Sequence, residues 1–261
     1  MTVSIADDFR ESLKRYRFWL VFGLSDATSS FNRTALGGLF ITLNTLLRVL
    51  LLYFLFRDSI GQSEPKYFGY VSLGLPLFSL YSSAITQGYS ILTRNKSLIQ
   101  NIEMPFFAYI FRFITDLVFK FCFSSIPFAV YIIFNFETSG IPLLLLFVGL
   151  VVAFFMVLSI AVFCMTIAAF FPNLFEALSA AMGIMFFATP VFWHAGDRGG
   201  IRGLLASYNP FAHMLAIVRE PALGREYDPL SLAICVAITL LVGTAAAYLF
   251  RIARPWLIYR L

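Results

Sequence analysis

The sequence has few groups that could carry chemistry or hold a metal ion. Charged residues make up 13% of the 261 residues, against roughly 25% in soluble domains. Its 2 histidines, His194 and His213, lie far apart and lack a nearby carboxylate–histidine pattern, so we expect no metal site. The cysteines all fall in apolar runs, which indicates buried, reduced packing residues and no disulfide: Cys122, Cys164 and Cys235.

Enzyme motifs are also missing. No lysine follows a glycine, so the chain has no Gly-x-x-x-x-Gly-Lys-Ser/Thr loop to hold nucleotide phosphates. A Gly-x-Ser-x-Gly nucleophile elbow and a His-x-x-x-x-Asp acyltransferase motif are both absent from the sequence. We therefore expect neither catalysis nor a cofactor in this chain. A membrane transferase acting on a lipid phosphate, the main alternative from another class, would need clustered acids or histidines.

Hydrophobic residues, in contrast, make up 60% of the chain and gather in long runs. A membrane-spanning helix needs roughly 20 mainly apolar residues. The runs predict an all-α polytopic membrane protein of one domain, with six spans at about 34–56, 67–92, 105–135, 141–171, 174–193 and 229–250. The third run is longer than one crossing, so we expect it to tilt or to project into water.

The placement of lysine and arginine predicts which end of the protein is cytoplasmic. Ten basic residues fall on one side of the predicted spans, and both termini belong to that side. They are Arg10, Lys14, Arg15, Arg17, Arg33, Arg94, Lys96, Arg251, Arg254 and Arg260. The tail, 252–261, is then cytoplasmic. The net charge of +5 is explained by these flanks facing anionic lipid headgroups, and we expect no nucleic acid partner.

The first 33 residues do not form a span but lead into one. On a helix, Phe9, Leu13, Tyr16, Leu20 and Leu24 fall on one stripe, and charged residues fall on the other side. This pattern is typical of a helix lying in the membrane interface. We therefore predict a cytoplasmic, interfacial amphipathic helix over about 7–26. The alternative is an extension of the first span.

Charges within apolar runs are rare enough to be candidate functional groups. Arg48 lies near the middle of the first span, where it could be a salt-bridged packing residue or a contact in a path for an anionic substrate. Arg112, Asp116 and Lys120 share one helix face and predict a ladder of alternating charge. The aromatic residues near span ends, including Tyr53 and Trp193, could line a path for sugars or simply form interfacial belts.

Residues 194–228, between the last two spans, contain the most informative segment. Asn209–Gly224 (NPFAHMLAIVREPALG) follows Thr189–Trp193 (TPVFW) and is too short and polar to span a bilayer. Asn209 and Pro210 predict the start of a helix, and Pro221 with Gly224 its end. The helix would place apolar side chains on one face and His213, Arg219 and Glu220 on the other. The alternative to a functional role is an inert interfacial helix.

Four segments and the tail make the chain similar to a known family. Phe31–Leu43 (FNRTALGGLFITL), Asn95–Pro105 (NKSLIQNIEMP), Thr189–Trp193 and Asn209–Gly224 resemble the permease subunits of type-2 ABC exporters, in the branch that exports lipid-linked O-antigen or capsule. Arg251–Leu261 (RIARPWLIYRL) also fits, so the resemblance covers nearly the whole chain. The chain departs from the family at Phe40, where a tryptophan is common.

The resemblance implies a permease subunit that is not itself an enzyme, in a bacterial inner membrane. Its partners would be a second copy of the chain, two ATP-binding-cassette subunits that bind ATP and Mg, the membrane lipids and an undecaprenyl-diphosphate-linked polysaccharide. Thr93, Arg94, Asn95, Lys96, Ser97 and Leu98 would contact the ATPase.

The substrate path and gate would include Arg48, Tyr53, Pro190, Trp193, Asn209, Pro210, His213, Arg219 and Glu220. Short external helices within 194–228 would form the gate, and 229–251 the last span. Alternatives within transport are capsule or teichoic-type polymer export and drug or haem export. A passive structural partner is a further alternative.

Overall fold

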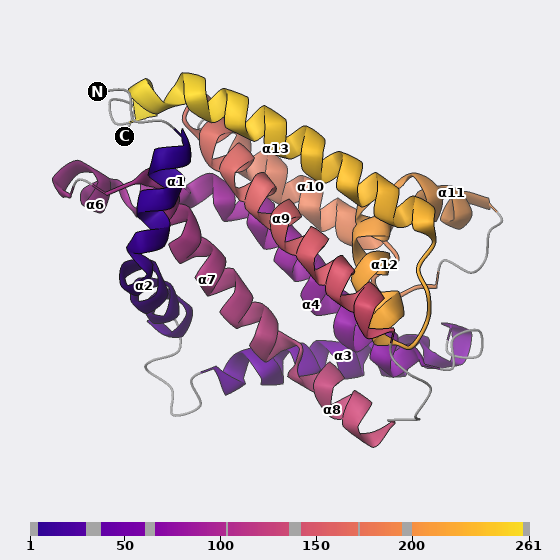
Figure 1. Ribbon diagram of the computed structural model, residues 1–261. Helices are drawn as coiled ribbons and strands as arrows, with labels where there is room; N and C mark the ends of the chain where they lie inside the picture. The colour runs from indigo at the N-terminus through magenta and orange to yellow at the C-terminus, as the bar shows by residue number, and fades with distance from the viewer. Residues whose placement is uncertain are drawn as a thin grey trace.

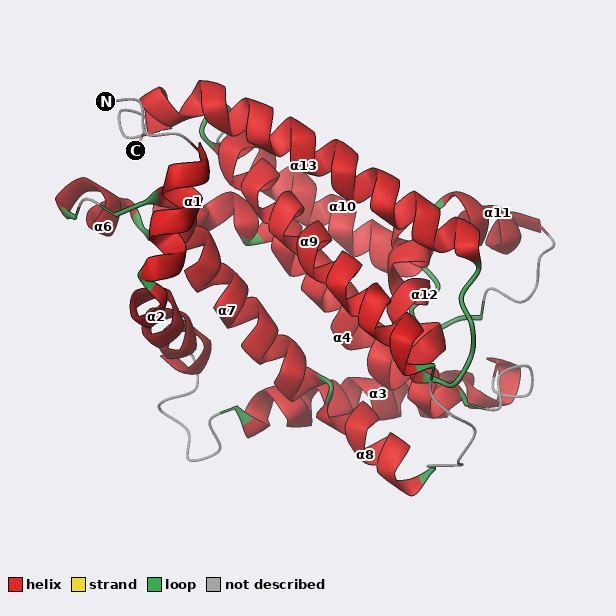
Figure 2. Ribbon diagram, viewed as in Figure 1, coloured by secondary structure: helices red, strands yellow, loops and turns green. Residues whose placement is uncertain are grey.

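The computed structural model describes residues 5–29, 38–60, 66–102, 104–135, 142–171, 173–194 and 200–257. Within these ranges the chain is helical and has no strand, as the composition predicts (Figure 2). The predicted starts of the first and fourth spans, at 34 and 141, lie outside the described residues, as do 195–199 and 258–261. The helices are α1 (Ile5–Lys14), α2 (Tyr16–Ser29), α3 (Leu39–Ile60), α4 (Tyr67–Thr86), η1 (Gly88–Ser90), α5 (Ile91–Arg94), α6 (Lys96–Asn101), α7 (Phe106–Ser124), α8 (Ile126–Phe134), α9 (Leu143–Ala168), α10 (Leu174–Ala188), α11 (Gly200–Tyr208), α12 (Pro210–Ala222) and α13 (Pro229–Leu257).

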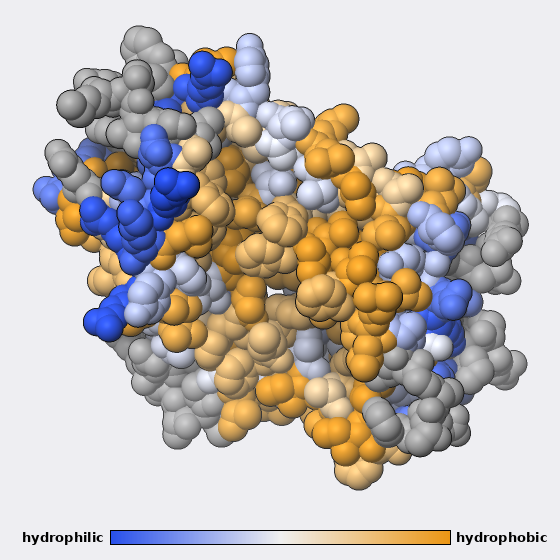
Figure 3. Space-filling view, viewed as in Figure 1, coloured by the Kyte–Doolittle hydropathy of each residue, from blue (hydrophilic) through white to orange (hydrophobic). Residues whose placement is uncertain are grey.

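Five helical stretches are long and apolar enough to cross a membrane, which agrees with a multi-pass membrane protein. They are Leu39–Asp58, Tyr67–Arg94, Phe106–Phe134, Leu143–Ala168 and Pro229–Arg254. In Figure 3, hydrophilic residues gather over α1 and α2 at one end and near α11 at the other, with apolar residues between them.

The stretch predicted as the fifth span, 174–193, is shorter as a helix. Helix α10 has 15 residues, or about 22 Å, against a hydrocarbon core of about 30 Å. It ends because Thr189 precedes Pro190, and a residue before proline is disfavoured in helical geometry. Thr189 is accordingly extended, with φ −98° and ψ 141°. Five helical stretches are therefore long and apolar enough to cross a membrane, and a sixth crossing stays a prediction.

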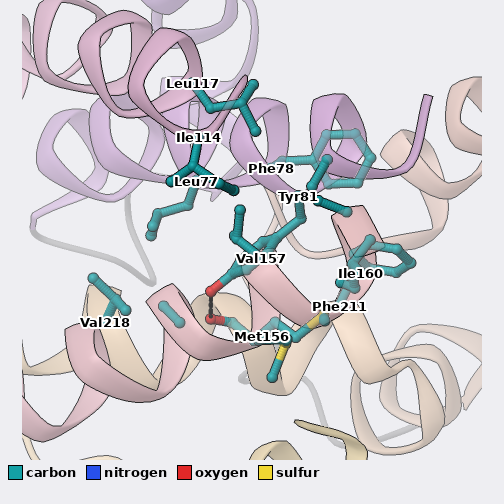
Figure 4. Packing of buried hydrophobic residues seen from close by; sticks show 14 of the residues in the cluster. Leu77, Phe78, Tyr81, Ile114, Leu117, Met156, Val157, Ile160, Phe211 and Val218 are labelled. Carbon is teal, nitrogen blue, oxygen red and sulfur yellow. Dashed lines mark hydrogen bonds between the residues drawn. The ribbon is translucent and has the colours of Figure 1, made fainter. Parts of the chain in front are cut away.

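Helix α4 lies at the centre and packs against α3, α7, α9, α10 and α12 (Figure 1). Buried side chains from α4, α7, α9 and α12 meet in the core shown in Figure 4, where Tyr81 donates a hydrogen bond to the Met214 carbonyl at 3.2 Å. Helices α9 and α12 come especially close. A Cβ atom at Gly149 would lie 2.1 Å from the carbonyl oxygen of Ile217, so only glycine permits this approach.

The two ends of the bundle carry different elements. Figure 1 places α1, α6 and the C-terminal end of α13 at one end and α11 at the other. The prediction had put the termini and the 93–98 turn on one side and the 194–228 segment on the other. The arrangement agrees with that grouping.

The N-terminal helix predicted over 7–26 is two helices, α1 and α2, which meet at Arg15 and pack against α7. Phe9 of the predicted stripe contacts Phe107 and Phe111 edge to face. Leu13, Tyr16, Leu20 and Leu24 are exposed, so most of the apolar stripe faces away from the protein. That exposure suits contact with lipid.

The third span is also interrupted. Helix α7 ends at Ser124, and α8 begins at Ile126 with Pro127 in its first turn. Proline is tolerated there because the first turn has no intrahelical partner for its missing N–H. The break at Ser125 divides the long apolar run of 105–135 between two helices.

Candidate functional site

The predicted site residues lie in three separate parts of the bundle. The residues around Pro190 and Arg219 form a buried network near the end that carries α11, which we call the clasp. Arg48 lines a groove between α3, α4 and α7. Thr93–Leu98 form α5 and α6 at the end that carries α1 (Figure 1).

The clasp holds the non-helical turn Thr189–Trp193 through its backbone carbonyls. The Tyr67 hydroxyl donates to the Phe192 carbonyl at 2.8 Å. The Tyr70 hydroxyl lies 3.0 Å from the Pro190 carbonyl and 3.1 Å from that of Trp193. Arg219 Nη1 donates to the same Pro190 carbonyl at 2.7 Å. Irregular backbone is tolerated at membrane depth where protein buries and pairs it, and the clasp meets that requirement.

Asn209 joins the clasp to the start of α12. Its Nδ2 donates to the Ala188 carbonyl at 3.1 Å and to Thr189 Oγ1 at 2.9 Å. Its Oδ1 accepts from Phe211 N at 2.9 Å, so it also caps the helix. Pro210 is the first helical residue. The predicted helix start is therefore confirmed, and the capping residue also fixes the end of α10.

Arg219 was predicted to lie on the polar face of this helix, and in the structure it is buried. It is 2% exposed, and its guanidinium carbon lies 3.6 Å from the centre of the Tyr70 ring. The reason is that α12 packs inside the bundle against α4, α9 and α13, so its polar side chains also need protein partners. Helix α12 is therefore packed within the bundle and does not lie along its surface. A Cβ at Gly74 would lie 2.8 Å from the Val191 carbonyl, so α4 admits the turn only at a glycine.

The other predicted polar residues of α12 are half-buried connectors. His213 Nδ1 lies 2.9 Å from Ser231 Oγ of α13, and its Nε2 lies 3.0 Å from the Ser207 carbonyl of α11. Glu220 has an oxygen 3.5 Å from Arg219 Nε and the other 3.6 Å from Arg225 Nη1. These residues tie α11, α12 and α13 together.

The two predicted aromatic path residues occupy different settings. Trp193 is buried, and its indole N–H donates to the Phe187 carbonyl at 3.1 Å, so its ring is a packing element of the clasp. Tyr53 of α3 stacks on Tyr67 with ring centres 6.2 Å apart. Arg57 lies over the Tyr53 ring at 5.7 Å. Tyr53 therefore joins α3 to the clasp.

Helices α5 and α6 form a polar projection with a fixed base. Thr93, Arg94, Lys96 and Ser97 are exposed, and Leu98 is half-buried. Figure 1 shows α6 projecting away from the bundle. Asn95 is the buried exception within this predicted coupling segment.

Asn95 is held by Arg112, which was predicted to pair with Asp116. Its Oδ1 accepts from Arg112 Nη1 at 3.0 Å, and Arg112 Nη2 donates to Asp26 Oδ1 of α2 at 2.7 Å. The predicted charge ladder forms only in part, because Lys120 pairs with Asp116 at 2.8 Å while Arg112 turns to Asp26. Packing of α2 against α7 supplies this nearer carboxylate, which no local pattern indicates.

Asp8 is a buried carboxylate whose partners no local sequence pattern indicates. It is 2% exposed and accepts from Phe107 N at 3.1 Å and from Arg254 Nη2 at 2.7 Å. It therefore joins α1 to the first turn of α7 and to α13. Burial raises the pKa of Asp8 from its ordinary value of 3.8, although the Phe107 N–H and the Arg254 charge act in the opposite direction.

The raised pKa of Asp8 predicts a pH-dependent stability. The folded chain binds this proton more tightly than the unfolded chain, so its contribution is fully present below pH 3.8 and is lost as the pH rises through the raised pKa. We expect Asp8→Asn to remove this part of the decline in melting temperature between about pH 4 and 7. Thermal unfolding of both proteins across that range measures it, and parallel pH profiles would contradict it.

Within the described ranges, no group of three or more His, Cys, Asp or Glu side chains could hold a metal ion. No family model matches the chain, and no curated protein matches it either, so its function has to be inferred from the residues and their arrangement.

Proposed function

We propose that the chain is the membrane permease subunit of an ATP-driven exporter whose ATPase is a separate protein. The observation that carries this proposal is the projection formed by α5 and α6. Its exposed Thr93, Arg94, Lys96 and Ser97 offer polar contacts to a soluble partner. Its base is fixed to the bundle through Asn95 and Arg112.

A fixed projection can transmit a displacement to the membrane helices. A push on α6 acts on Asn95, then on Arg112 of α7 and, through its carboxylate partner, on α2. The sequence has no phosphate-binding loop, so in this proposal a partner subunit hydrolyses ATP and supplies the energy. Two ATP-binding-cassette subunits, with ATP and Mg, would fill that role.

The proposed assembly contains a second copy of the chain. None of the residues of α10 is buried, and of the described residues of α3 only Val49 is. These two helices, with the turn of the clasp, offer surface for a pore between two copies. In this arrangement α10 and the turn complete the fifth crossing, and α11 and α12 form the external gate.

The proposed cargo is an undecaprenyl-diphosphate-linked polysaccharide, such as O-antigen, exported across the bacterial inner membrane with both termini cytoplasmic. Deletion of the gene is expected to abolish the surface polysaccharide and to leave lipid-linked polymer inside the cell. Normal surface polysaccharide, with no lipid-linked polymer accumulating inside the cell, would refute this proposed cargo. Accumulation of capsule or teichoic-type polymer instead would identify a different glycan.

The projection gives a direct test of coupling. Replacing Arg94 and Lys96 together by alanine should lower the ATP turnover of the co-purified complex about tenfold, because two exposed charged contacts are lost, each worth roughly 0.5–1 kcal/mol. The matched control is Arg57→Ala with Arg202→Ala, which removes two exposed charges predicted to face the other side. Equal turnover in the two double variants would refute coupling through this projection.

A further inference from the structure

The groove that contains Arg48 combines charge with apolar walls. It lies between α3, α4 and α7 and has a volume of about 240 Å³. Its polar lining includes Asn44, Arg48, Ser79 and Lys120. Much of the remaining lining is apolar, as at Leu80 of α4 and Leu117 of α7.

Arg48 has no counter-charge in the described part of the chain. It is exposed near the middle of the span Leu39–Asp58, and the described residues offer it neither an ion pair nor a hydrogen bond. A charged side chain at the centre of a bilayer costs about 2.5–3.5 kcal/mol by the lowest scales, so it needs an anion or water. An anion entering the groove would supply what the protein does not.

Lys120 adds a second cation on the α7 side of the groove. Its Nζ donates to Asp116 Oδ2 at 2.8 Å, yet its side chain is 32% exposed against 5% for Asp116. An ammonium group has three donors, so one carboxylate contact leaves capacity for another anion. Asn44 and Ser79 add an amide and a hydroxyl as neutral donors.

We infer that this groove binds the phosphate head group of a lipid phosphate, with Arg48 and Lys120 as its cationic ligands. Guanidinium and ammonium groups together suit a multiply charged phosphate, which both can contact through charge-assisted hydrogen bonds. The apolar walls suit the first carbons of the lipid chain. The apolar part of the lining favours a lipid over a free anion, because an inorganic anion would leave Leu80 and Leu117 without an apolar partner.

The site stands on these residues alone, whereas the polyprenyl nature of its natural lipid rests on the proposed function. A binding experiment separates the two. The full chain in detergent is titrated with undecaprenyl phosphate, phosphatidic acid, undecaprenol and inorganic diphosphate, and retention is measured by native mass spectrometry. We expect both lipid phosphates to bind and undecaprenol to be retained poorly. Equal affinity for the two lipid phosphates would agree with a lipid-phosphate site. It would also mean that the site gives no support to a polyprenyl cargo.

Arg48→Gln should weaken retention of undecaprenyl phosphate about tenfold, the effect of losing one charge-assisted contact. Arg57→Gln is the matched control, since it removes an exposed arginine from the same helix outside the groove. Equal loss in the two variants would overturn the site. So would tight binding of undecaprenol, or full displacement of the lipid by inorganic diphosphate.

Lys120 is tested through a gain of binding. Asp116→Asn removes the carboxylate that pairs with Lys120. The ammonium group is then free to contact the phosphate, so retention of undecaprenyl phosphate should rise severalfold. Unchanged or weaker retention in a variant that melts like the parent would exclude Lys120 from the site.

Discussion

Replacing Arg219 by methionine is expected to destabilise the chain and to open the clasp. Methionine keeps much of the apolar stem but loses the hydrogen bond to the Pro190 carbonyl and the contact with the Tyr70 ring. A hydrogen bond from a charged donor is worth about 1.5–3 kcal/mol and a desolvated cation–π contact about 2 kcal/mol. Allowing for the smaller burial cost of methionine, we expect the free energy of unfolding to fall by about 3 kcal/mol.

The loss should be measured by SDS-induced unfolding of the purified chain and compared with that of Arg225→Met. Arg225 also contacts Glu220, but its side chain is 34% exposed, against 3% for Arg219. Its replacement should change stability by less than about 1 kcal/mol. Equal losses in the two variants would contradict a special role for Arg219.

The same substitution tests the proposed gate. Once Arg219 is removed, the Pro190 carbonyl keeps only the Tyr70 hydroxyl among its described partners. The turn Thr189–Trp193 should then move, and proteoliposomes with Arg219→Met should leak a small dye that the parent retains. Tyr70→Phe keeps the ring beneath Arg219 and removes two hydrogen bonds to the turn, so it should give an intermediate leak. If proteoliposomes with Arg219→Met retain the dye as the parent does, the clasp has a structural role and is not part of a gate.

The long helices could be predicted from the sequence because hydrophobic length is a local property. Each run of apolar residues predicts a span without knowledge of its neighbours, and five of the six are found. The end of α10 could also have been predicted locally, from the Thr189–Pro190 pair. The predicted span instead continued to Trp193 because the residues after Pro190 are apolar. A helix boundary before proline deserved more weight than continued hydrophobicity.

Burial of α12 could not be predicted in the same way. A helical wheel places Arg219 on the face opposite the apolar side chains, but it does not show what that face contacts. In the structure its partners come from Tyr70 on α4 and Pro190 after α10, both far away in sequence. Only the tertiary packing of α12 brings these groups together.

The partners of two carboxylates show the same limit. Asp8 and Asp26 look like ordinary polar residues of an amphipathic segment, yet Asp8 pairs with Arg254 of α13 and Asp26 with Arg112 of α7. The predicted pairing of Arg112 with Asp116 followed the local spacing. It fails for Arg112 because the carboxylate of Asp26, on another helix, accepts from two of its guanidinium nitrogens, Nε and Nη2.

Replacing Arg112 by glutamine is expected to loosen α2 and the projection together. The side chain of Arg112 is 16% exposed and holds Asp26 with two donors and Asn95 with a third. Because the carboxylate of Asp26 is 41% exposed, water can partly replace its arginine. We expect a loss of about 2 kcal/mol in the free energy of unfolding, below the 3–5 kcal/mol of a fully buried pair.

Arg94→Gln is the matched control for this change, since it removes an exposed arginine from neighbouring α5. SDS-induced unfolding should distinguish the two variants clearly. In the complex with its ATPase, Arg112→Gln should also lower the coupling between ATP turnover and export, whereas ATP binding by the partner should not change. Identical stability of the two variants would mean that the contacts of Arg112 are not needed to hold α2.

A double-mutant cycle separates the two functions of Arg112. In the background of Asp26→Asn, Arg112→Gln should cost about 1 kcal/mol less, because the ion pair has already been removed. The remaining cost belongs to the hydrogen bond with Asn95, and Asn95→Ala should remove most of it. If the coupling defect follows Asn95 and the stability defect follows Asp26, then Arg112 acts as a joint between the projection and the bundle. If both defects follow Asp26 alone, α2 carries the displacement and the bond to Asn95 only supports the turn.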